Sequence, residues 1–478
     1  MNFRFLILLV LSTFSFESQA QLNSLKSQDE FMCDYEVVKR NSESYQDLES
    51  FEKLLTKQSK PPLMMNATDV EGAVPYTYKG FYIQPIYFEA LPYKNNCTLV
   101  FGWLSTPLVI SEEGVAGAIL LHGGGATALK EWCEKWADKG MASLSIGLEG
   151  QTDQKAVPKF KKTPFPGPRR KGAYCDSQLP IPEQWMYHTM AQSIMANTLL
   201  RSQHGVNADN VGVAGVSWGG VLTATLITFD YDRLAFAIPG YGCGSLVGSD
   251  SGIARQMGRA GAVDLYERVW DPTTRYENLL RRIDVSRMPP TLWISWPNES
   301  HFPIERQLHT YQTLIDHGAE AMVLLVPKFG HGHGMIWRRP ESYFFVESVI
   351  HSRKQKLEDL DVSSDQAVHG SVYAHQVDKY VLKHGPKRVH SLVFRSAKPF
   401  VKAELIYSCE SDTQLALYHK AWHTRAVDRL VSVDCEIETE CLWLVSFNEK
   451  QEFDHCSWFI NLLTNNGMLV SSTLNHHN

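Results

Sequence analysis

The amino-acid sequence predicts an α/β fold with a mostly parallel sheet, followed by a small all-β sandwich domain. Strand-like and helix-like segments alternate between residues 115 and 326, as they do in chains that form parallel sheets covered by helices. After about residue 356 the segments become short and strand-like, without convincing helices between them. The 478 residues, 44% hydrophobic and 21% charged, suffice for two or three domains with a large core. We therefore expect an α/β domain with an N-terminal lead-in over residues 21–356 and a β-sandwich domain over residues 357–478.

The first twenty residues differ in composition from the rest of the chain. Arg4 and the amino terminus provide positive charge, residues 5–11 are continuously apolar, and Ser18-Gln19-Ala20 supplies the small residues that a signal peptidase recognises. This arrangement predicts a secretory signal peptide over residues 1–20, and hence a secreted or periplasmic protein. A membrane anchor is the weaker alternative, because the apolar run is shorter than the ~20 residues that span a bilayer.

The predicted strands of the α/β domain differ in their apolar patterns. Residues 115–121 form a continuous apolar run, which is typical of a strand buried on both faces of a parallel sheet. The two runs that precede it are rich in β-branched and aromatic residues. The full set of expected strands is residues 76–90, 98–106, 115–121, 141–146, 211–216, 234–239, 292–295 and 321–326.

Two helices are expected between these strands. In residues 183–201 the apolar side chains of Met186, Met190 and Ile194 recur every four positions, which predicts a helix with one apolar stripe and a second stripe beside it. A second helical stretch covers residues 304–315. The segment from 157 to 171 is rich in Pro, Lys and Arg and is expected to form a long surface loop.

The cysteines and the net charge limit the cofactors and partners that we expect. Disulfides are most favoured among Cys409, Cys435, Cys441 and Cys456, without a defined connectivity, and the odd total of nine leaves at least one thiol over. No CxxC pair or zinc-like spacing is present, so no metal and no cofactor are expected. The net charge of −6 gives no reason to expect nucleic acid or a membrane as partner. The short basic run Arg169-Arg170-Lys171 is expected to be a solvated loop.

A GxSxG motif follows the predicted strand 211–216. In Gly215-Val216-Ser217-Trp218-Gly219, the two glycines would allow a sharp turn from strand to helix that exposes the Ser217 hydroxyl. A chain of this length contains such a motif by chance roughly once in seven times. A coincidental glycine-rich turn is therefore the alternative to a nucleophile at Ser217.

A glycine run at the end of another strand weakens that alternative. His122-Gly123-Gly124-Gly125 comes directly after residues 115–121, where backbone N–H groups can point at a developing oxyanion. We predict an oxyanion hole made by the amides of Gly124, Gly125 and Trp218. A plain flexible turn is the alternative, and His122 is expected to have a structural role.

The acid and the base are expected later in the chain, after two further strands. Glu299 follows residues 292–295, and His331 and His333 follow residues 321–326. Both loops leave the carboxyl ends of strands, where ligands bind in open α/β sheets. We predict Glu299 as the acid, His331 as the base and His333 as a residue that lines the substrate site, with His333 as the alternative base.

The residue before the acid is excluded from that role by its chemistry. Asn298 is a neutral amide and cannot stabilise an imidazolium as a carboxylate can. Asn298-Glu299-Ser300 also matches an N-glycosylation sequon. Because a glycan would crowd the predicted site, we expect Asn298 to be unmodified.

Three sequence runs resemble a known family. They are Glu183-Gln184-Trp185-Met186-Tyr187-His188, Gly215-Val216-Ser217-Trp218-Gly219-Gly220 and Tyr241-Gly242-Cys243-Gly244. They resemble the acetyl-xylan-esterase-like α/β hydrolases, relatives of dienelactone hydrolase and prolyl oligopeptidase. The resemblance covers roughly residues 75–350, and Ser457-Trp458-Phe459-Ile460-Asn461 resembles the β-sandwich tail of some secreted members. It implies an α/β-hydrolase fold with the nucleophile at Ser217 and the terminal histidine at His331.

The chain departs from the family at the acid. Relatives usually carry a Gly-x-Asn-Asp stretch where this chain has Trp296-Pro297-Asn298-Glu299, so Glu replaces Asp. Dienelactone hydrolases proper use a cysteine nucleophile, and Ser217 argues against their reaction.

The motifs and the resemblance together predict an exported serine carboxylic-ester hydrolase that forms an acyl-enzyme at Ser217. Its expected substrate is an acylated carbohydrate or a small ester, from which it removes acetyl or other short acyl groups. One alternative is a secreted serine peptidase of the prolyl-oligopeptidase type, although the sequence has no repeats typical of the β-propeller that such peptidases carry. A second alternative is a catalytically inactive scaffold that binds carbohydrate.

Overall fold

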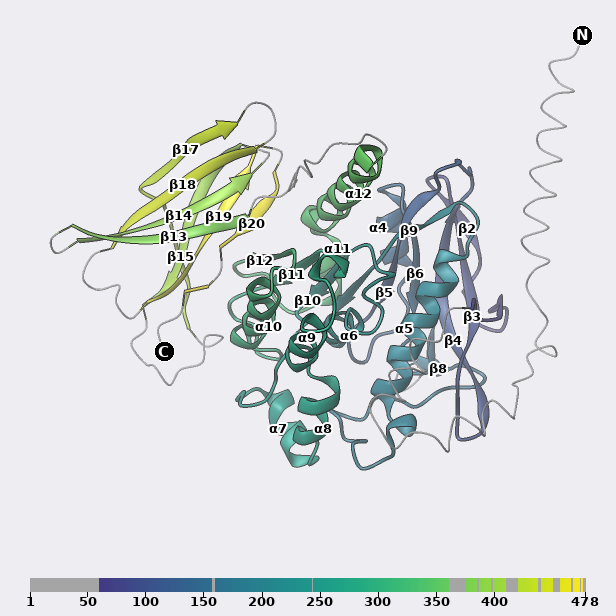
Figure 1. Cartoon of the computed structure of the whole chain (residues 1–478). Coiled ribbons are helices and arrows are strands. Elements are labelled where there is room, and N and C mark those ends of the chain that lie inside the picture. The colour runs from purple at the N-terminus through teal and green to yellow at the C-terminus, as the bar shows by residue number, and fades with distance from the viewer. Residues whose placement is uncertain are drawn as a thin grey trace, which may run out of the picture.

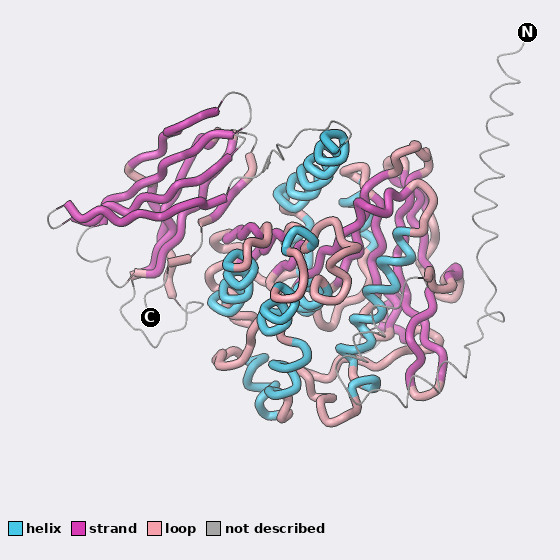
Figure 2. The backbone as a smooth tube through the Cα atoms, viewed as in Figure 1, coloured by secondary structure: helices cyan, strands magenta, loops and turns pink. Residues whose placement is uncertain are grey.

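The computed structural model describes most of the chain beyond residue 59. The described residues are 60–156, 160–242, 244–360, 375–384, 387–396, 399–409, 420–436, 440–449, 456–465, 467–472 and 474–475. The predicted signal peptide, residues 1–20, lies outside them. Figure 1 shows an α/β body and, beside it, a second part that carries β13 to β20. In Figure 2 the helices of the described chain belong to the α/β body, and the second part consists of strands and loops.

A ten-stranded sheet forms the centre of the α/β body. Its strand order is β1-β3-β4-β6-β5-β9-β10-β11-β12, and β2 pairs with β3. The strands from β6 to β12 in this order are parallel to their neighbours, whereas β1 to β4 pair antiparallel. The bounds are β1 Met64–Asn66, β2 Tyr76–Tyr78, β3 Phe81–Tyr93, β4 Asn96–Pro107, β5 Val115–Leu121, β6 Ala142–Ile146, β9 Val206–Val216, β10 Ala237–Gly240, β11 Thr291–Ser295 and β12 Ala321–Leu325. The mostly parallel sheet predicted from the sequence is thus confirmed.

Helices cover both faces of this sheet (Figure 1). On β5, Ile119 and Leu121 pack in the core that includes α5 Trp185–Arg201 and α6 Trp218–Leu226. Ala118 and Leu120 pack in the core on the opposite face, with α4 Lys130–Ala137 and α12 Pro340–Leu360. Burial on both faces explains why β5 is apolar at consecutive positions.

The remaining helices are short or lie on the α5 face. They are η2 Ile181–Glu183, α7 Gly252–Arg259, α8 Val263–Leu265, η3 Tyr266–Trp270, α9 Pro272–Leu280, η4 Val285–Arg287, α10 Ile304–Asp316 and α11 His333–Trp337. The helices predicted over residues 183–201 and 304–315 correspond to α5 and α10. Within the described chain, no helix combines the length and the apolar composition that crossing a membrane requires.

The second part of the chain is a β-sandwich, as predicted. Two four-stranded antiparallel sheets have the orders β13-β14-β18-β17 and β16-β15-β19-β20. Their inner faces share an apolar core that includes Phe394, Leu405 and Phe447. The bounds are β13 His375–His384, β14 Lys387–Ser396, β15 Phe400–Ser408, β16 His423–Ala426, β17 Arg429–Glu436, β18 Glu440–Glu449, β19 Ser457–Thr464 and β20 Leu469–Ser471. The domain boundary predicted after residue 356 falls in the last turn of α12.

Disulfides occur where the sequence favoured them. Cys409 is bonded to Cys456, which links the end of β15 to the start of β19. Cys441 is also disulfide-bonded, and Cys435 is its partner in the β17–β18 register. Cys97, outside the predicted group, is disulfide-bonded as well. These bonds are typical of proteins that fold in an oxidising compartment.

The β-sandwich covers the edge strand of the central sheet. The Leu325 N–H on β12 donates to Ser471 Oγ at 2.9 Å, and Asn461 Nδ2 donates to the Leu325 carbonyl at 3.0 Å. Ser471 Oγ in turn donates to Asn461 Oδ1 at 2.6 Å. An uncovered edge strand exposes a row of unpaired backbone groups. The two sandwich side chains therefore satisfy the polar groups at the end of β12 and fix the sandwich to the sheet.

We expect Asn461→Ala to lower the free energy of unfolding by about 1–3 kcal/mol, because it leaves the buried Leu325 carbonyl without its donor and the buried Ser471 hydroxyl without its acceptor. Urea unfolding followed by tryptophan fluorescence would measure the change. Thr424→Ala, at an exposed position of β16, is the control and should unfold like the wild type. Equal stability of the two variants would contradict this account of the interface.

Candidate active site

Ser217 occupies a sharp turn between β9 and α6. Its backbone has φ 59° and ψ −120°, a conformation that L-residues rarely adopt outside constrained functional turns. A Cβ on Gly215 would lie 2.0 Å from the Gly219 carbonyl oxygen, and a Cβ on Gly219 would lie 2.0 Å from the Leu121 carbonyl oxygen. Both flanking positions must therefore be glycine. This close packing holds the Ser217 side chain at the carboxyl end of β9.

His331 connects the hydroxyl of Ser217 to a carboxylate. His331 Nε2 lies 3.0 Å from Ser217 Oγ, and His331 Nδ1 lies 2.8 Å from Glu299 Oε2. Because a carboxylate only accepts, the Nδ1–H donates to Glu299, and Nε2 is left to accept the proton of Ser217. Glu299 and His331 follow the neighbouring parallel strands β11 and β12, whose carboxyl ends lie side by side. The structure thus brings the predicted nucleophile, base and acid together in one hydrogen-bonded chain.

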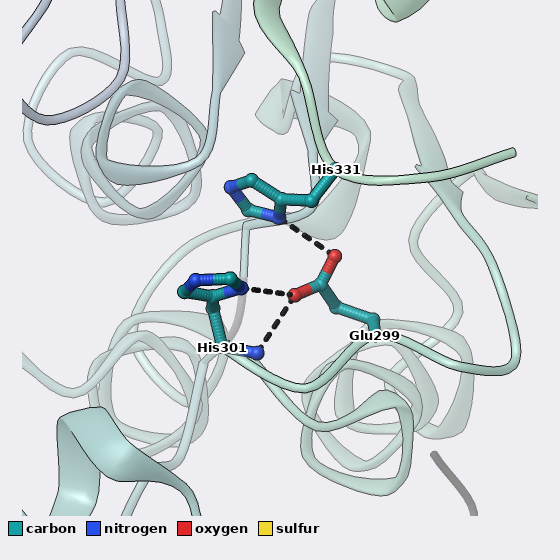
Figure 3. Close-up of side chains that lie close together, drawn as sticks. All are labelled: Glu299, His301 and His331. Atoms are coloured by element: carbon teal, nitrogen blue, oxygen red, sulfur yellow. Dashed lines mark hydrogen bonds and ion pairs between the residues drawn. The ribbon is translucent and has the colours of Figure 1, made fainter. Parts of the chain in front are cut away.

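Glu299 is completely buried and is surrounded by donors (Figure 3). Trp296 Nε1 donates to Oε2 at 2.9 Å, and the His301 backbone N–H donates to Oε1 at 2.8 Å. Burial alone would raise the pKa of this carboxyl. Hydrogen bonds from His301, His331 and Trp296, together with the charge of His331, outweigh burial and lower the pKa to about 2. Glu299 is therefore negative at neutral pH and can stabilise an imidazolium.

His301 is a partner of Glu299 that the sequence analysis did not identify. Its side chain is 58% exposed, its Nδ1 lies 3.5 Å from Glu299 Oε1, and its ring centroid lies 4.4 Å from that of His331. The hydrogen bond to Glu299 raises the pKa of His301, against the effect of burial. Among the described residues, Glu299, His301 and His331 also place three possible metal-ligand atoms within 4.8 Å of one another. The carboxylate pairs with both rings.

Tyr241 supports the loop that carries His331. Its ring centroid lies 4.8 Å from that of His331, and its hydroxyl donates to the Gly330 carbonyl at 2.6 Å. The residue is fully buried at the end of β10. It therefore packs against the imidazole of His331 and fixes the turn just before it.

The glycine run after β5 presents its three amides to different partners. The Gly123 N–H donates to His333 Nε2 at 2.8 Å, and the Gly125 N–H donates to Glu149 Oε1 at 3.1 Å. Within the described residues, the Gly124 N–H has no hydrogen-bond partner. The N–H of Trp218 is also free there, as expected at the first residue of a helix. The predicted oxyanion hole is therefore corrected: Gly124 and Trp218 offer open amides, and Gly125 does not.

His333 and His122, the two histidines that contact the glycine run, both hydrogen-bond to backbone groups. His333, predicted to line the substrate site, accepts the Gly123 N–H, and burial lowers its pKa, so its ring is neutral at neutral pH. His122 is buried, with Nδ1 2.6 Å from the Gly123 carbonyl oxygen and Nε2 accepting the Leu148 N–H at 2.9 Å. Burial lowers the His122 pKa to about 4. The structural role expected for His122 agrees with these contacts.

Arg170 corrects the prediction of a solvated basic loop. Its Nε donates to Glu149 Oε1 at 3.1 Å, and the side chain is only 20% exposed. The guanidinium carbon lies 5.2 Å from the ring centroid of Trp218, and Nη2 lies 2.5 Å from where a Cβ of Gly124 would be. Arg170 thus packs against the glycine run and Trp218. Glu149 follows the carboxyl end of β6, and this position after a strand was the sequence signal that could have identified it. No sequence signal identified Arg170.

Asn298 contacts the β-sandwich domain next to the acid. Its Nδ2 donates to the Lys420 backbone carbonyl at 2.9 Å, and Lys420 is buried. A glycan would attach at this nitrogen, which is already hydrogen-bonded to the Lys420 carbonyl. The contact supports the prediction that Asn298 is unmodified.

Comparisons with known proteins agree with this geometry. The prolyl oligopeptidase family model (Peptidase_S9) matches residues 179–349, which contain Ser217, Glu299 and His331. No curated protein matches the chain in sequence.

Solved structures with a similar fold include esterases and a peptidase. The acetyl xylan esterase from Paenibacillus sp. R4 is 21% identical, with a TM-score of 0.42, over 69% of this chain and 98% of that one. Acetyl xylan esterase 1 from Thermoanaerobacterium sp. JW/SL YS485 is 14% identical, with a TM-score of 0.41, over 60% and 89%. The acylaminoacyl peptidase of Pyrococcus horikoshii is 19% identical, with a TM-score of 0.41, over 55% and 41%.

The family match covers less than half of the chain. It confirms the relation to prolyl oligopeptidase and its relatives over residues 179–349. Together with the observed sheet and the sharp turn at Ser217, it identifies the α/β body as an α/β hydrolase related to the prolyl oligopeptidase family.

We expect Ser217→Ala to keep the fold and to lower kcat on the order of 10⁶-fold, because the variant has no nucleophile. A fluorophosphonate probe should label the wild type at Ser217 and leave the variant unlabelled. Circular dichroism would confirm that the variant is folded. Turnover within tenfold of the wild type would exclude Ser217 as the nucleophile.

His331→Ala and His333→Ala are expected to differ sharply in kcat. Only His331 reaches Ser217 Oγ, so its loss should cost several orders of magnitude, whereas loss of His333 should cost far less. Steady-state turnover of both variants on one ester substrate gives the ranking. The reverse order would transfer the role of general base to His333.

Proposed function

We propose that this α/β hydrolase is a serine carboxylic-ester hydrolase that works through an acyl-enzyme. The observation that carries the proposal is the chain of hydrogen bonds from Ser217 through His331 to the buried Glu299. The open amides of Gly124 and Trp218 add a site for the negative charge that develops during acyl transfer. The arrangement needs no cofactor.

In the proposed acylation step, Ser217 Oγ attacks the carbonyl carbon of the ester while its proton passes to His331 Nε2. The carbonyl oxygen becomes an oxyanion that accepts from the Gly124 and Trp218 amides. His331 then gives the proton to the departing alcohol oxygen, the C–O bond breaks, and the acyl group stays on Ser217. Glu299 keeps the Nδ1–H oriented and stabilises the imidazolium throughout.

Deacylation repeats these steps with water in place of Ser217. His331 Nε2 takes a proton from the water, whose oxygen attacks the acyl carbon and forms a second oxyanion. His331 returns the proton to Ser217 Oγ as the C–Oγ bond breaks. The carboxylic acid leaves, and the site is ready for another cycle.

The proposed substrate is an acylated carbohydrate that loses acetyl or another short acyl group outside the cytoplasm. The resemblance of the sequence runs around Ser217 to acetyl-xylan-esterase-like hydrolases supports the substrate class. The predicted signal peptide and the disulfide at Cys409 and Cys456 support a secreted or periplasmic location. Both remain proposals that the substrate assay and cell fractionation would test.

A serine peptidase is the second candidate, because the family model that matches residues 179–349 is that of prolyl oligopeptidase. In the described residues the domain beside the α/β body is a β-sandwich and not a propeller. An ester also has a better leaving group than an amide. These two points favour the ester.

We expect Glu299→Gln to lower kcat by up to ~10⁴-fold, because the amide keeps the shape of the carboxylate but loses the counter-charge for His331. The KM for a small ester should change little. Turnover and KM on the same ester would separate the two effects. An unchanged kcat would mean that another carboxylate serves His331.

We expect the purified protein to hydrolyse short acyl esters, acetyl esters best, to release acetate from an acetylated polysaccharide, and to leave peptide substrates intact. Acetate release and cleavage of an acylated peptide anilide would be measured side by side, with Ser217→Ala as the blank. Peptide cleavage without any esterase activity would favour the peptidase. Absence of both, with no fluorophosphonate labelling, would favour an inactive scaffold.

A further inference from the structure

The glycine run that carries the proposed oxyanion amide is held from both sides by ionisable side chains. Gly123 is bound by His333, and Gly125 is bound by Glu149. We propose that His333 and Glu149 are positioning residues that clamp this loop, so that the Gly124 N–H between them stays directed at the reacting carbonyl. The proposal rests on the proposed acyl-transfer function and assigns two residues that take no proton from the substrate.

The first half of the clamp joins the glycine run to the segment that carries the base His331. His333 begins α11, two residues after His331, and its Nε2 accepts the Gly123 N–H at 2.8 Å. A Cβ on Gly123 would lie 2.7 Å from that nitrogen and 2.9 Å from Ser217 Cβ. The ring, the glycine and the nucleophile are therefore packed in direct contact. The same short segment therefore brings His331 to Ser217 and His333 to Gly123.

The second half of the clamp is a buried ion pair. Glu149 is 6% exposed, and its Oε1 accepts both the Gly125 N–H and Arg170 Nε, each at 3.1 Å. Arg170 Nη1 donates to the Gly172 carbonyl at 2.9 Å, and its guanidinium packs on the ring of Trp218. Two donors on the same oxygen hold the carboxylate in one orientation. Glu149 is consequently a fixed acceptor rather than a mobile side chain.

Three consecutive glycines need such restraints because glycine adopts more backbone conformations than any other residue. An oxyanion donor contributes most when it is already oriented before the reaction begins. With the peptides on both sides held, the ends of the Gly123–Gly124 peptide are fixed, so the Gly124 N–H can turn away from the reacting carbonyl only by a local flip of that one peptide. Loss of one clamp should therefore weaken transition-state binding while leaving ground-state binding of a small ester nearly unchanged.

The experiment compares truncation with conservative replacement at each clamp. Glu149→Ala and His333→Ala remove the acceptor, whereas Glu149→Gln and His333→Gln each keep a side-chain oxygen that can accept the glycine N–H. The matched controls are Glu112→Ala and His204→Ala, at exposed positions away from the site. Turnover of p-nitrophenyl acetate would be divided by the number of active sites, counted by complete fluorophosphonate labelling, so that misfolded protein does not enter kcat.

We expect each Ala variant to lower kcat per active site by about 10–100-fold with KM within threefold of the wild type, less than the 10²–10³-fold cost of deleting an oxyanion donor outright. The Gln variants should recover most of the loss, and the controls should match the wild type. The inhibition constant of a boronic acid, whose adduct places an oxygen at the oxyanion position, should rise in parallel with the fall in kcat.

Two results would overturn the clamp. One is kcat per active site in both Ala variants within threefold of an active wild type. The other is a Gln variant no better than its Ala counterpart, which would assign the effect to packing or charge. Failure of the wild type to turn over any acyl ester would overturn the proposed function and the clamp with it, so the two failures are distinguishable.

Discussion

A carboxylate with no exposure to water organises the site. The charge of Glu299 is stable only because Trp296, His301 and His331 supply donors to it, and an unpaired charge at that depth would take up a proton instead. The loop after β11 must therefore wrap around the carboxylate. That wrapping fixes the plane of the His331 ring and, through the ring, the direction in which Ser217 can lose its proton. The strained turn at Ser217 supplies the other fixed end of the same chain of bonds.

The β-sandwich takes part in this organisation. The sheet that carries the triad ends at β12, the strand before His331, and Ser471 and Asn461 satisfy the end of that edge. The Asn298 side chain, directly beside Glu299, donates to the backbone of Lys420 in the sandwich. The loops of the acid and the base are thus both supported by the second domain. The sandwich braces the catalytic body by these contacts, whether or not it also binds a polymer.

The local pattern of apolar residues predicted the strands that are buried along their whole length. It did not predict contacts between residues that lie far apart in the sequence. Residues 115–121 coincide with β5 because both of its faces are buried, whereas β9 begins at Val206, five residues before the predicted start, since its first half is only partly buried. The triad could be predicted because parallel strands bring their carboxyl ends to one edge. Arg170 was not assigned, because a basic residue in a Pro-rich segment cannot be told from a solvated one by sequence, and only the structure shows its contacts with Glu149 and Trp218. Glu149 was not assigned, because its partner Gly125 lies in a distant part of the sequence. Gly125 was wrongly expected in the oxyanion hole for the same reason: its acceptor is 24 residues away.

The two histidines show why spacing alone left the base undecided. Gly332, between them, is extended, with φ −172° and ψ 147°, and side chains on either side of an extended residue lie on the same face of a regular strand. Here the second histidine starts a helix, so the chain bends at that point and the two rings reach different targets, Ser217 and Gly123. The pKa of His333 is lowered by burial and by the neighbouring His331, which suits a ring that must accept an N–H rather than carry a proton. The two histidines of this glycine-rich turn therefore have different proposed roles. His331 moves the proton, and His333 holds the glycine run in place.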